Sequence, residues 1–463
     1  MKTRTEKDSL GPVEVPYDAL WGAQTQRSLQ FFAIGSETFP VDFIRSFITV
    51  KKAAAIANQQ LGKLPDDIHQ WIVKACDELR NNFDQAHFPL SIWQTGSGTQ
   101  TNMNVNEVIA NHANRLAGSE PGIKSPVHPN DHVNLSQSSN DVFPTVMHIS
   151  ACQSVQKNLL PSLENLIATV NNKQQAFEDK IKSGRTHMMD ATPVTLGQEF
   201  SAYAAQLDYA RRQIQAVLPE VKQLAIGGSA VGTGLNTHAQ WSQTVTGIIN
   251  QLTSSDYTSA NNKFMALAGH EALADLHGRI TVLANSLYKI SGDLRLMASG
   301  PRCGLAEISL PENEPGSSIM PGKVNPTQIE AMTMVAIQVM GNNTAVQFAA
   351  SQGHFELNVY KPLIIHNMLQ SIQLLADGMA SLNQYCIAGI TANDKKLSDY
   401  VAQSLMLVTA LTPVIGYDKA GEAARLAHTR NISLKEAVLA LGYMDEMEFE
   451  RYMKPEDMLG ECP

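Results

Sequence analysis

The sequence predicts a mainly α-helical protein whose long helices form a central bundle. Apolar residues recur at helical spacing over several long stretches, and β-strand signals are sparse. A chain of 463 residues is also too long for one compact core, which predicts more than one domain. We expect an N-terminal domain over 1–137, a central helical bundle over 138–395 and a small C-terminal domain over 396–463.

Helical periodicity locates the expected helices. In 102–116, Val105, Val108 and Ile109 fall on one face, and Gly118 follows as a plausible stop. The remaining long segments share apolar residues at helical spacing and have few caps in their interiors. They are 142–182, with an interruption near Pro161, and 193–224, 263–298, 327–350 and 357–390, followed by short C-terminal helices at 419–429 and 433–441.

The segment 331–337 is apolar on every face. A helix of this composition needs neighbours on all sides, so it belongs inside a bundle. The helices of one protomer need not cover it completely, and burial between identical subunits is the natural solution. The sequence therefore predicts self-association.

The composition argues against several classes of partner. The net charge of -9 opposes binding to nucleic acid or to an anionic membrane surface, and no apolar run is long enough to cross a membrane. The first ten residues lack the apolar core of a secretory signal. The five cysteines lie far apart, which predicts reduced thiols in the cytoplasm and no disulfide framework, iron–sulfur cluster or other metal site. We expect no cofactor.

The richest chemical signal is the loop 316–326, with the sequence GSSIMPGKVNP. It combines a pair of serines, the cation Lys323 and the carboxamide of Asn325. A helix is expected to follow, with Asn325 at the N-cap and Pro326 at the first helical position. Because a helix N-terminus presents unpaired N–H groups and a partial positive charge, we expect this loop to hold a carboxylate.

This loop resembles the signature loop of the fumarase/aspartase superfamily, whose members add or eliminate a group across the double bond of fumarate. TGSGTQTNMN at 95–104 and GRTH at 184–187 resemble two further conserved regions of that family. The similarity extends from 21–28 to 416–419, and within the superfamily the chain most resembles the class II fumarate hydratases. The resemblance implies a three-domain, mainly α-helical fold and a homotetramer that pools the central helices and shares its active sites between subunits.

Four polar segments lie before expected helix starts, and the resemblance implies that they grip both carboxylates of a small dicarboxylate substrate. Each residue alone could equally be an ordinary N-cap. Their combination, at four places far apart in the chain, favours a site for one dianion. The expected substrate-binding residues are Ser97, Gly98, Thr99, Ser138, Ser139, Asn140, Thr186, Ser318, Lys323, Val324 and Asn325.

His187 is the expected acid/base for the water that is added or removed. Glu330, on the helix after the signature loop, would be its carboxylate partner, orienting the ring and raising its basicity. Ammonia-lyases of the aspartase type usually carry Gln at the matching position. His187 therefore favours water over ammonia as the transferred group.

Ser317 resembles the serine that the family assigns as the base for the carbon-bound proton. A free serine hydroxyl is a weak base, so N–H groups of the loop and Lys323 would have to stabilise its alkoxide. Ser318 stays open as the alternative, because spacing alone does not separate the two.

One further segment resembles a second anion site of the family and consists of His128, Pro129, Asn130 and Asp131. The competing interpretation is a plain Pro/Asn turn. Relatives often place a basic residue where this chain has Ser125, which weakens the expectation of an anion there.

The resemblance implies a fumarate hydratase, which interconverts fumarate and L-malate stereospecifically through a carbanion-like aci-carboxylate intermediate. The alternatives are aspartate ammonia-lyase, which His187 opposes, and a non-catalytic scaffold, which the intact set of polar residues opposes. The glycine-rich segment 227–234 lacks the GK[ST] ending of a phosphate loop. We expect it to be a mobile or ligand-facing connection.

Overall fold

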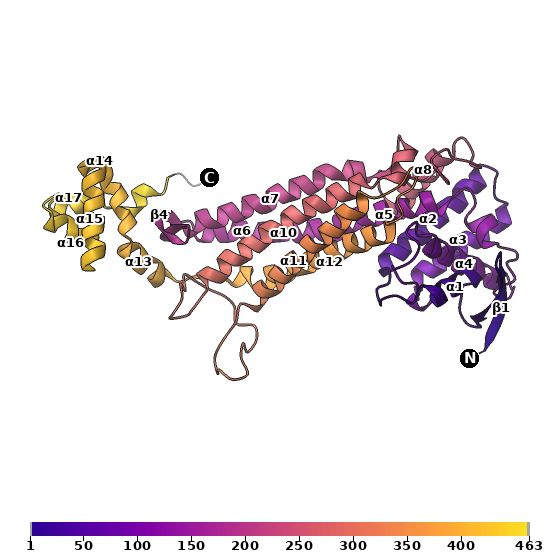
Figure 1. Ribbon diagram of the computed structural model, residues 1–463, viewed down its shortest axis with the longest axis horizontal. Helices are drawn as coiled ribbons and strands as arrows, with labels where there is room; N and C mark the ends of the chain where they lie inside the picture. The colour runs from indigo at the N-terminus through magenta and orange to yellow at the C-terminus, as the bar shows by residue number, and fades with distance from the viewer. Residues whose placement is uncertain (1, 461–463) are drawn as a thin grey trace. The chain divides into compact units, whose positions relative to one another are not determined.

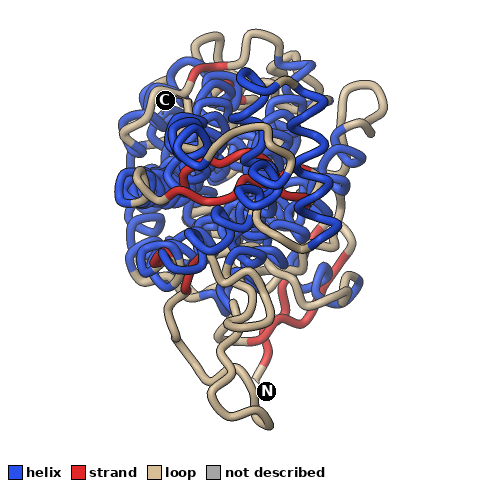
Figure 2. The backbone as a smooth tube through the Cα atoms, turned by 90° about the vertical axis from the view of Figure 1, so that its left-hand side faces the viewer, coloured by secondary structure: helices blue, strands red, loops and turns tan. Residues whose placement is uncertain are grey.

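The computed structural model describes residues 2–460 and consists mainly of helices joined by loops and short strands (Figures 1 and 2). The predicted mainly α-helical class is confirmed. Within the described residues the strands form four two-stranded sheets. The chain divides into two compact units, and each unit is made of three segments of the sequence. The first unit contains Met1–Leu159, Gln213–Thr281 and Gln338–Leu374, and the second contains Leu160–Arg212, Val282–Ile337 and Leu375–Pro463.

These units interleave along the chain, whereas the sequence suggested three consecutive domains. Each long central helix contributes one part to each unit, because the boundaries fall inside α7, α10, α11 and α12. The three-domain division over 1–137, 138–395 and 396–463 stays a prediction.

The first unit opens with an antiparallel hairpin, in which β1 (Thr3–Asp8) pairs with β2 (Gly11–Pro16). Helix α4 begins three residues earlier than expected, and Gly118 (φ 83°) follows its end as predicted. Phe143 of α5 packs against Phe43 and Phe47 of α2, with ring centroids 5.5 and 6.0 Å apart. The helices of this unit that precede the central bundle are α1 (Ala23–Phe31), α2 (Val41–Gln60), α3 (Asp66–Asn81), η1 (Gln85–His87), α4 (Thr99–Leu116), η2 (Pro129–Val133), α5 (Ser139–Ser154) and η3 (Val155–Leu159).

The interruption expected near Pro161 lies a few residues earlier, at the π-helical turn η3. Pro161 is the second residue of α6 (Leu160–Ala176). Proline is tolerated in the first turn of a helix because the N–H that it lacks would have no partner there. The break therefore precedes the proline.

The helix expected from 193 begins later, because its first residues form a strand. β3 (Ile181–Thr186) and β4 (Met189–Thr195) make an antiparallel hairpin in which Ser183 lies opposite Pro193. Helix α7 (Leu196–Val221) then starts after Thr195, whose Oγ1 accepts the Gln198 N–H at 2.9 Å. This reciprocal cap sets the helix start.

The central helices are α7, α10 (Glu271–Met297), α11 (Thr327–Ala350) and α12 (Lys361–Tyr385). The expected helix 263–298 is divided by Gly269 and His270 into α9 (Lys263–Ala268) and α10. Buried polar contacts join three of these helices within the first unit. The two ring nitrogens of His277 lie 3.1 Å from Asn343 Oδ1 and 2.9 Å from Ser371 Oγ.

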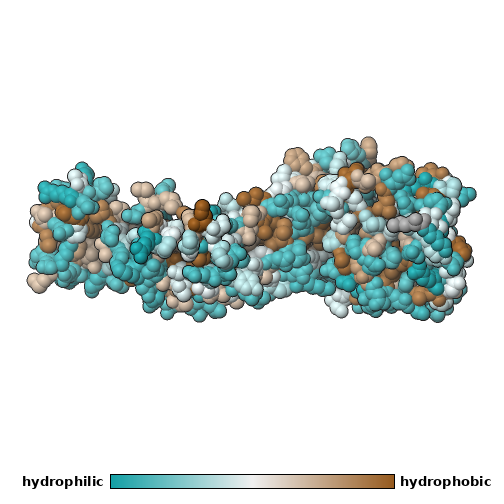
Figure 3. All heavy atoms as spheres, turned by 90° about the horizontal axis from the view of Figure 1, so that it is seen from below, coloured by the Kyte–Doolittle hydropathy of each residue, from teal (hydrophilic) through white to brown (hydrophobic). Residues whose placement is uncertain are grey.

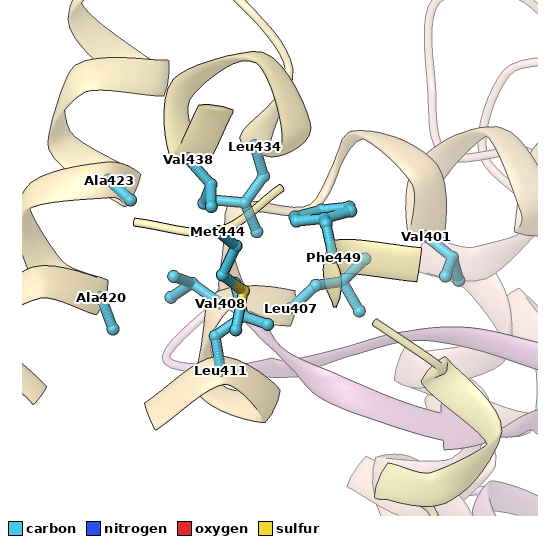
Figure 4. Packing of buried hydrophobic residues seen from close by; sticks show 10 residues of the cluster. All are labelled: Val401, Leu407, Val408, Leu411, Ala420, Ala423, Leu434, Val438, Met444 and Phe449. Carbon is cyan, nitrogen blue, oxygen red and sulfur yellow. The ribbon is translucent and has the colours of Figure 1, made fainter. Parts of the chain in front are cut away.

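The C-terminal segment has its own apolar core (Figure 4). Side chains of Val408, Leu411, Val438, Met444 and Phe449 meet there, and most are almost completely buried. The short helices of this segment are α13 (Asp394–Gln403), η5 (Leu405–Leu411), α14 (Thr412–Ile415), α15 (Tyr417–Arg430), α16 (Leu434–Ala440), α17 (Glu446–Tyr452) and η6 (Pro455–Met458), and Met444 lies in the loop between α16 and α17. The remaining short elements are β5 (Gln223–Leu224), β6 (Thr258–Ser259), α8 (Trp241–Thr253), β7 (Ile308–Ser309), η4 (Ile387–Gly389) and β8 (Thr391–Ala392).

Hydrophilic and hydrophobic residues are intermixed over the face seen in Figure 3. Among residues 2–460, no helix combines the length and the apolar character that a membrane span requires.

Candidate active site

The expected site residues divide between the two units, and each group is described within its own unit. Ser97, Gly98, Thr99, Ser138, Ser139 and Asn140 belong to the first unit. Thr186, His187, Ser317, Ser318, Lys323, Val324, Asn325 and Glu330 belong to the second.

The N-terminus of α4 carries the first polar group. Gly98 is the N-cap and adopts a left-handed conformation (φ 77°), and Ser97 Oγ lies 2.9 Å from Thr99 Oγ1. A Cβ at Gly98 would lie 2.2 Å from the Phe143 ring. Only glycine satisfies both the backbone conformation and this close approach. The turn that presents Ser97 and Thr99 is therefore held tightly against α5.

The N-terminus of α5 carries the second group, and hydrogen bonds connect it to the first. Ser138 forms a capping box with Asp141. Asn102 Nδ2 donates to Ser139 Oγ at 2.9 Å, which joins α4 to α5. Asn140 Nδ2 donates to the Ala230 carbonyl at 2.8 Å, so its amide is oriented by the glycine-rich segment. The structure thus brings these two predicted groups together.

Asp141 is a buried carboxylate that the sequence interpretation missed. It accepts N–H groups from Ser138, Gly227 and Ser229, each at 2.9 Å. Burial raises its pKa to about 6, against the lowering effect of these hydrogen bonds. The Ser-x-x-Asp spacing of a capping box before a helix was the sequence signal that could have identified it.

Lys51 is the second buried charge that was missed. Its Nζ donates to Asn134 Oδ1 at 2.9 Å and to Gln137 Oε1 at 3.0 Å. Burial lowers the pKa of Lys51 to about 7, and the charge of Asp141 opposes this shift. Its position within an apolar helix left no signal in the sequence, because the acceptors come from a distant loop.

In the second unit, Thr186 and His187 do not precede a helix, which corrects the sequence expectation. They lie at the turn of the β3–β4 hairpin, where His187 (φ 55°) and Met188 (φ 64°) are both left-handed. Two consecutive residues of this kind form the tight turn that suits a two-residue hairpin. His187 is consequently exposed at a hairpin tip, where it can reach a ligand.

The base of this hairpin is anchored by a buried ion cluster. Glu307 is fully buried and contacts Arg185 Nη1 at 2.8 Å and Lys182 Nζ at 3.2 Å. Lys182 also contacts Glu199 of α7 at 2.6 Å. Breaking a buried ion pair by removing one partner is strongly destabilising, so this cluster holds the strand that carries His187.

The signature loop is closed by its own hydrogen bonds. The Gly316 N–H donates to the Lys323 carbonyl at 2.8 Å, and Asn325 Nδ2 donates to the Gly316 carbonyl at 2.5 Å. Asn325 therefore closes the loop instead of capping the helix. The first helical hydrogen bond is accepted by the Pro326 carbonyl, and α11 begins at Thr327, one residue after the Pro326 start that the capping pattern predicted.

Ser317 Oγ accepts two backbone N–H groups, from Ile319 at 3.3 Å and Met320 at 3.0 Å. Donors in this arrangement would stabilise a serine alkoxide. Ser318 and Lys323 are exposed, and neither Lys323 Nζ nor Ser318 Oγ has a partner within residues 2–460.

The expected pairing of Glu330 with His187 is not formed within one chain. Glu330 Oε1 instead lies 3.4 Å from Arg295 Nη2, and both side chains are about half exposed. An exposed pair at this distance is weak and can be exchanged for another partner. The His187–Glu330 pair stays a prediction.

The segment expected to form a second anion site is closed by local hydrogen bonds. His128 caps η2, and its Nδ1 accepts the N–H groups of Asn130 and Asp131 at 3.2 and 3.1 Å. Burial lowers the pKa of His128, which favours the neutral ring. Pro129 follows as the first residue of η2, and Lys124 Nζ donates to the Lys7 carbonyl. An anion-binding role for this segment stays a prediction.

Cysteines 76, 152, 303 and 386 are free thiols, and all but Cys303 are buried. Residues 2–460 contain no group of three or more His, Cys, Asp or Glu side chains that could hold a metal ion.

Comparison with known proteins shows similarity over the full length of the chain. A lyase family model matches residues 11–341, and a model of the fumarase C C-terminus matches 407–460. The chain is 57% identical to the class II fumarate hydratase of Bordetella parapertussis over 99% of both chains. It is 56% identical to that of Pseudomonas syringae, over 99% of this chain and 98% of the relative.

Two solved structures show the same similarity at the level of the fold. The crystal structure of the class II fumarase from Schistosoma mansoni superimposes with a TM-score of 0.97 at 44% identity, covering 99% of each chain. A Brucella melitensis structure described as fumarate lyase:delta crystallin has a TM-score of 0.95 at 38% identity, covering 99% of this chain and 100% of that one. On this evidence, the chain belongs to the class II fumarate hydratase family of lyases.

Proposed function

We propose that this chain is a fumarate hydratase, a hydro-lyase that interconverts fumarate and L-malate. The observation that carries the proposal is the 57% identity to a class II fumarate hydratase over 99% of both chains. The local geometry supports it, because His187, Ser318 and Lys323 are exposed and are groups of the kind that acid/base chemistry on a dicarboxylate requires.

In the direction from malate to fumarate, Ser317 takes the proton from C3. The two N–H groups that point at Ser317 Oγ support its choice over Ser318. The electron pair left at C3 is delocalised into the adjacent carboxylate, which becomes doubly charged. Lys323 and Asn325, with the backbone of Val324 and the hydroxyl of Ser318, would stabilise that charge.

The second step expels the C2 hydroxyl. His187, paired with Glu330 in the assembled enzyme, donates a proton to that oxygen, and water and fumarate are formed. In hydration His187 acts as the base that activates water. The helix ends at Ser97–Thr99 and Ser138–Asn140, together with Thr186, would hold the substrate carboxylates.

We further propose that the active form is a homotetramer with each active site shared between subunits. Within one chain Glu330 lies beside Arg295, and α11 exposes large apolar side chains such as Met334 and Phe348. A second copy would cover these side chains. A cytoplasmic location, expected from the scattered free thiols, also stays a proposal.

An ultraviolet assay tests this function. Purified protein should consume fumarate in buffer with water as the only co-reactant, and malate should appear in equal amount. Consumption that requires ammonium would show the alternative, an aspartate ammonia-lyase. No consumption under either condition would show a non-catalytic scaffold.

A further inference from the structure

A cavity of about 560 Å³ lies within the first unit, and none of the predicted active-site residues lines it. Its walls come from α2, the ends of α3, α5 and α8, η3 and part of α12. This volume lies within the range of about 300–1,000 Å³ that small-molecule sites occupy. The cavity is therefore large enough for a metabolite bigger than a four-carbon acid.

The charge of the cavity wall is positive. Arg45, Arg80 and Lys157 line it, and Asp42 is the single carboxylate among its lining residues in the described chain. Arg45 Nη1 lies 3.6 Å from Asp42 Oδ1, which is too long for a hydrogen bond, and the Asp42 side chain is 88% exposed. Such a solvated pair neutralises little of the arginine charge.

Three buried donors on this wall have no hydrogen-bond partner within residues 2–460. They are Arg45 Nε, Arg80 Nε and Ser150 Oγ, and Ser150 is only 5% exposed. Buried donors in folded proteins are almost always paired, because an unpaired one loses its hydration without compensation. An occupant that brings acceptor atoms would suit a wall with these donors.

The same cavity has apolar surface beside its donors. Phe43, Leu252 and Leu369 line it, and burial lowers the pKa of His366, which favours its neutral ring. A guanidinium presents a planar set of donors that matches phosphate oxygens in pairs. An occupant with both a multiply charged phosphate end and an organic body fits this division.

We propose that this cavity binds an organic phosphate, a metabolite whose diphosphate or triphosphate group contacts Arg45, Arg80 and Ser150. Its organic body lies against Leu252 and Leu369. The site is separate from the proposed hydratase site and does not depend on that activity.

Calorimetric titration of the intact protein tests the proposal with three probes: pyrophosphate, ADP and citrate. ADP should bind more tightly than pyrophosphate, because only ADP supplies an organic body. Citrate should bind more weakly than either, and higher salt should weaken all three. In an Arg45→Ala/Arg80→Ala variant the ADP affinity should fall by about tenfold or more, since two charge-assisted contacts are lost.

Two further variants keep the test independent of folding. Asp42→Asn removes the one opposing carboxylate, which is solvated and lies 3.6 Å from Arg45 Nη1, and should tighten ADP binding by at most about twofold. Lys74→Ala removes an exposed cation of α3 that does not line the cavity, and it should leave the affinity unchanged.

Three results would overturn the proposal. The first is that neither ADP nor pyrophosphate binds at low salt. The others are an ADP affinity that the double arginine variant leaves unaltered, and competitive displacement of ADP by malate. Citrate binding more tightly than ADP would assign a polycarboxylate instead. Altered subunit assembly of the double variant without ADP binding to the wild type would show that a partner chain fills the cavity.

Discussion

At the scale of single residues, one buried carboxylate organises a large part of the proposed substrate-binding surface. Asp141 ties the start of α5 to the backbone of Gly227 and Ser229, and that same segment orients Asn140. Asp141 is completely buried, so its role is to position other residues. The glycine-rich segment is therefore an internal anchor for α5.

Replacing Asp141 by Asn should separate positioning from folding. The amide keeps the shape but loses one acceptor oxygen, so its NH2 group faces either the Ser138 N–H or the N–H groups of Gly227 and Ser229, which are then unpaired. We expect KM for fumarate to rise several-fold with a smaller loss of kcat, because carboxylate binding is disturbed more than proton transfer. Circular dichroism at the assay temperature should match the wild type. An unchanged KM in a folded variant would contradict the positioning role.

Ser317 and Ser318 can be distinguished by alanine substitution. Ser317→Ala should lower kcat by about a hundredfold or more while fumarate binding is retained, because the base for the C3 proton is lost. Ser318→Ala is the matched control and should mainly raise KM. Steady-state rates in both directions are the measurement. The opposite pattern would assign Ser318 as the base.

The buried amine of Lys51 predicts a pH-dependent stability. Its folded pKa of about 7 lies below the value of an unfolded lysine, so the unfolded chain binds more protons between pH 7 and 10. Stability from this group therefore rises with pH, by at most about 1.4 kcal/mol for each pH unit. Between pH 7 and pH 9, the melting temperature of the wild type should rise relative to that of the Lys51→Met variant. A constant difference between the two proteins would exclude this titration.

At the scale of elements, the helix starts decide where the polar groups point. Gly98 combines a left-handed backbone with the Phe143 ring directly in the path of a Cβ. The β3–β4 hairpin places His187 at a turn and is held by Glu307 beneath it. In both cases a buried partner from another part of the chain fixes the position of a proposed functional residue.

Two glycine substitutions, one at each end of α4, test this. Gly98→Ala should destabilise the protein by more than about 2 kcal/mol and reduce kcat/KM, because strain and overpacking act together. Gly118→Ala is the control, since Gly118 is also left-handed (φ 83°) but a Cβ there meets nothing within 4 Å. It should cost about 1 kcal/mol and leave activity intact. Equal effects of the two substitutions would show that the contact with Phe143 is unimportant.

At the scale of the whole molecule, the proposed assembly explains the apolar surface of α11. Met334, Ile337 and Phe348 are 66%, 56% and 69% exposed in one chain. Large apolar side chains grouped on one long helix are typical of a surface that another subunit covers. A helix bundle pooled between copies would bury them.

Charge introduced on α11 should disrupt that assembly. Ile337→Glu is expected to shift sedimentation from tetramer to smaller species and to abolish activity, because each proposed site needs more than one copy. Met447→Lys, on the exposed face of α17, is the matched control and should change neither. An Ile337→Glu protein that sediments as a fully active tetramer would refute the pooled-helix arrangement.

The sequence by itself determined the helical class, the positions of most long helices and the family, because periodicity and an eleven-residue loop are local properties. It predicted 327–350 as a helix, and α11 spans those residues. The hairpin at His187 escaped this local interpretation, because Pro193 and its neighbours become a strand only through pairing with Ser183.

Only the tertiary structure decided which distant groups meet. Asp141 contacts the glycine-rich segment and Lys51 contacts Asn134, although each pair is remote in the sequence. Arg45 and Arg80, from different helices, line one cavity. Spacing along a chain does not encode such contacts, because burial and hydrogen-bond satisfaction are settled when the packed elements come together.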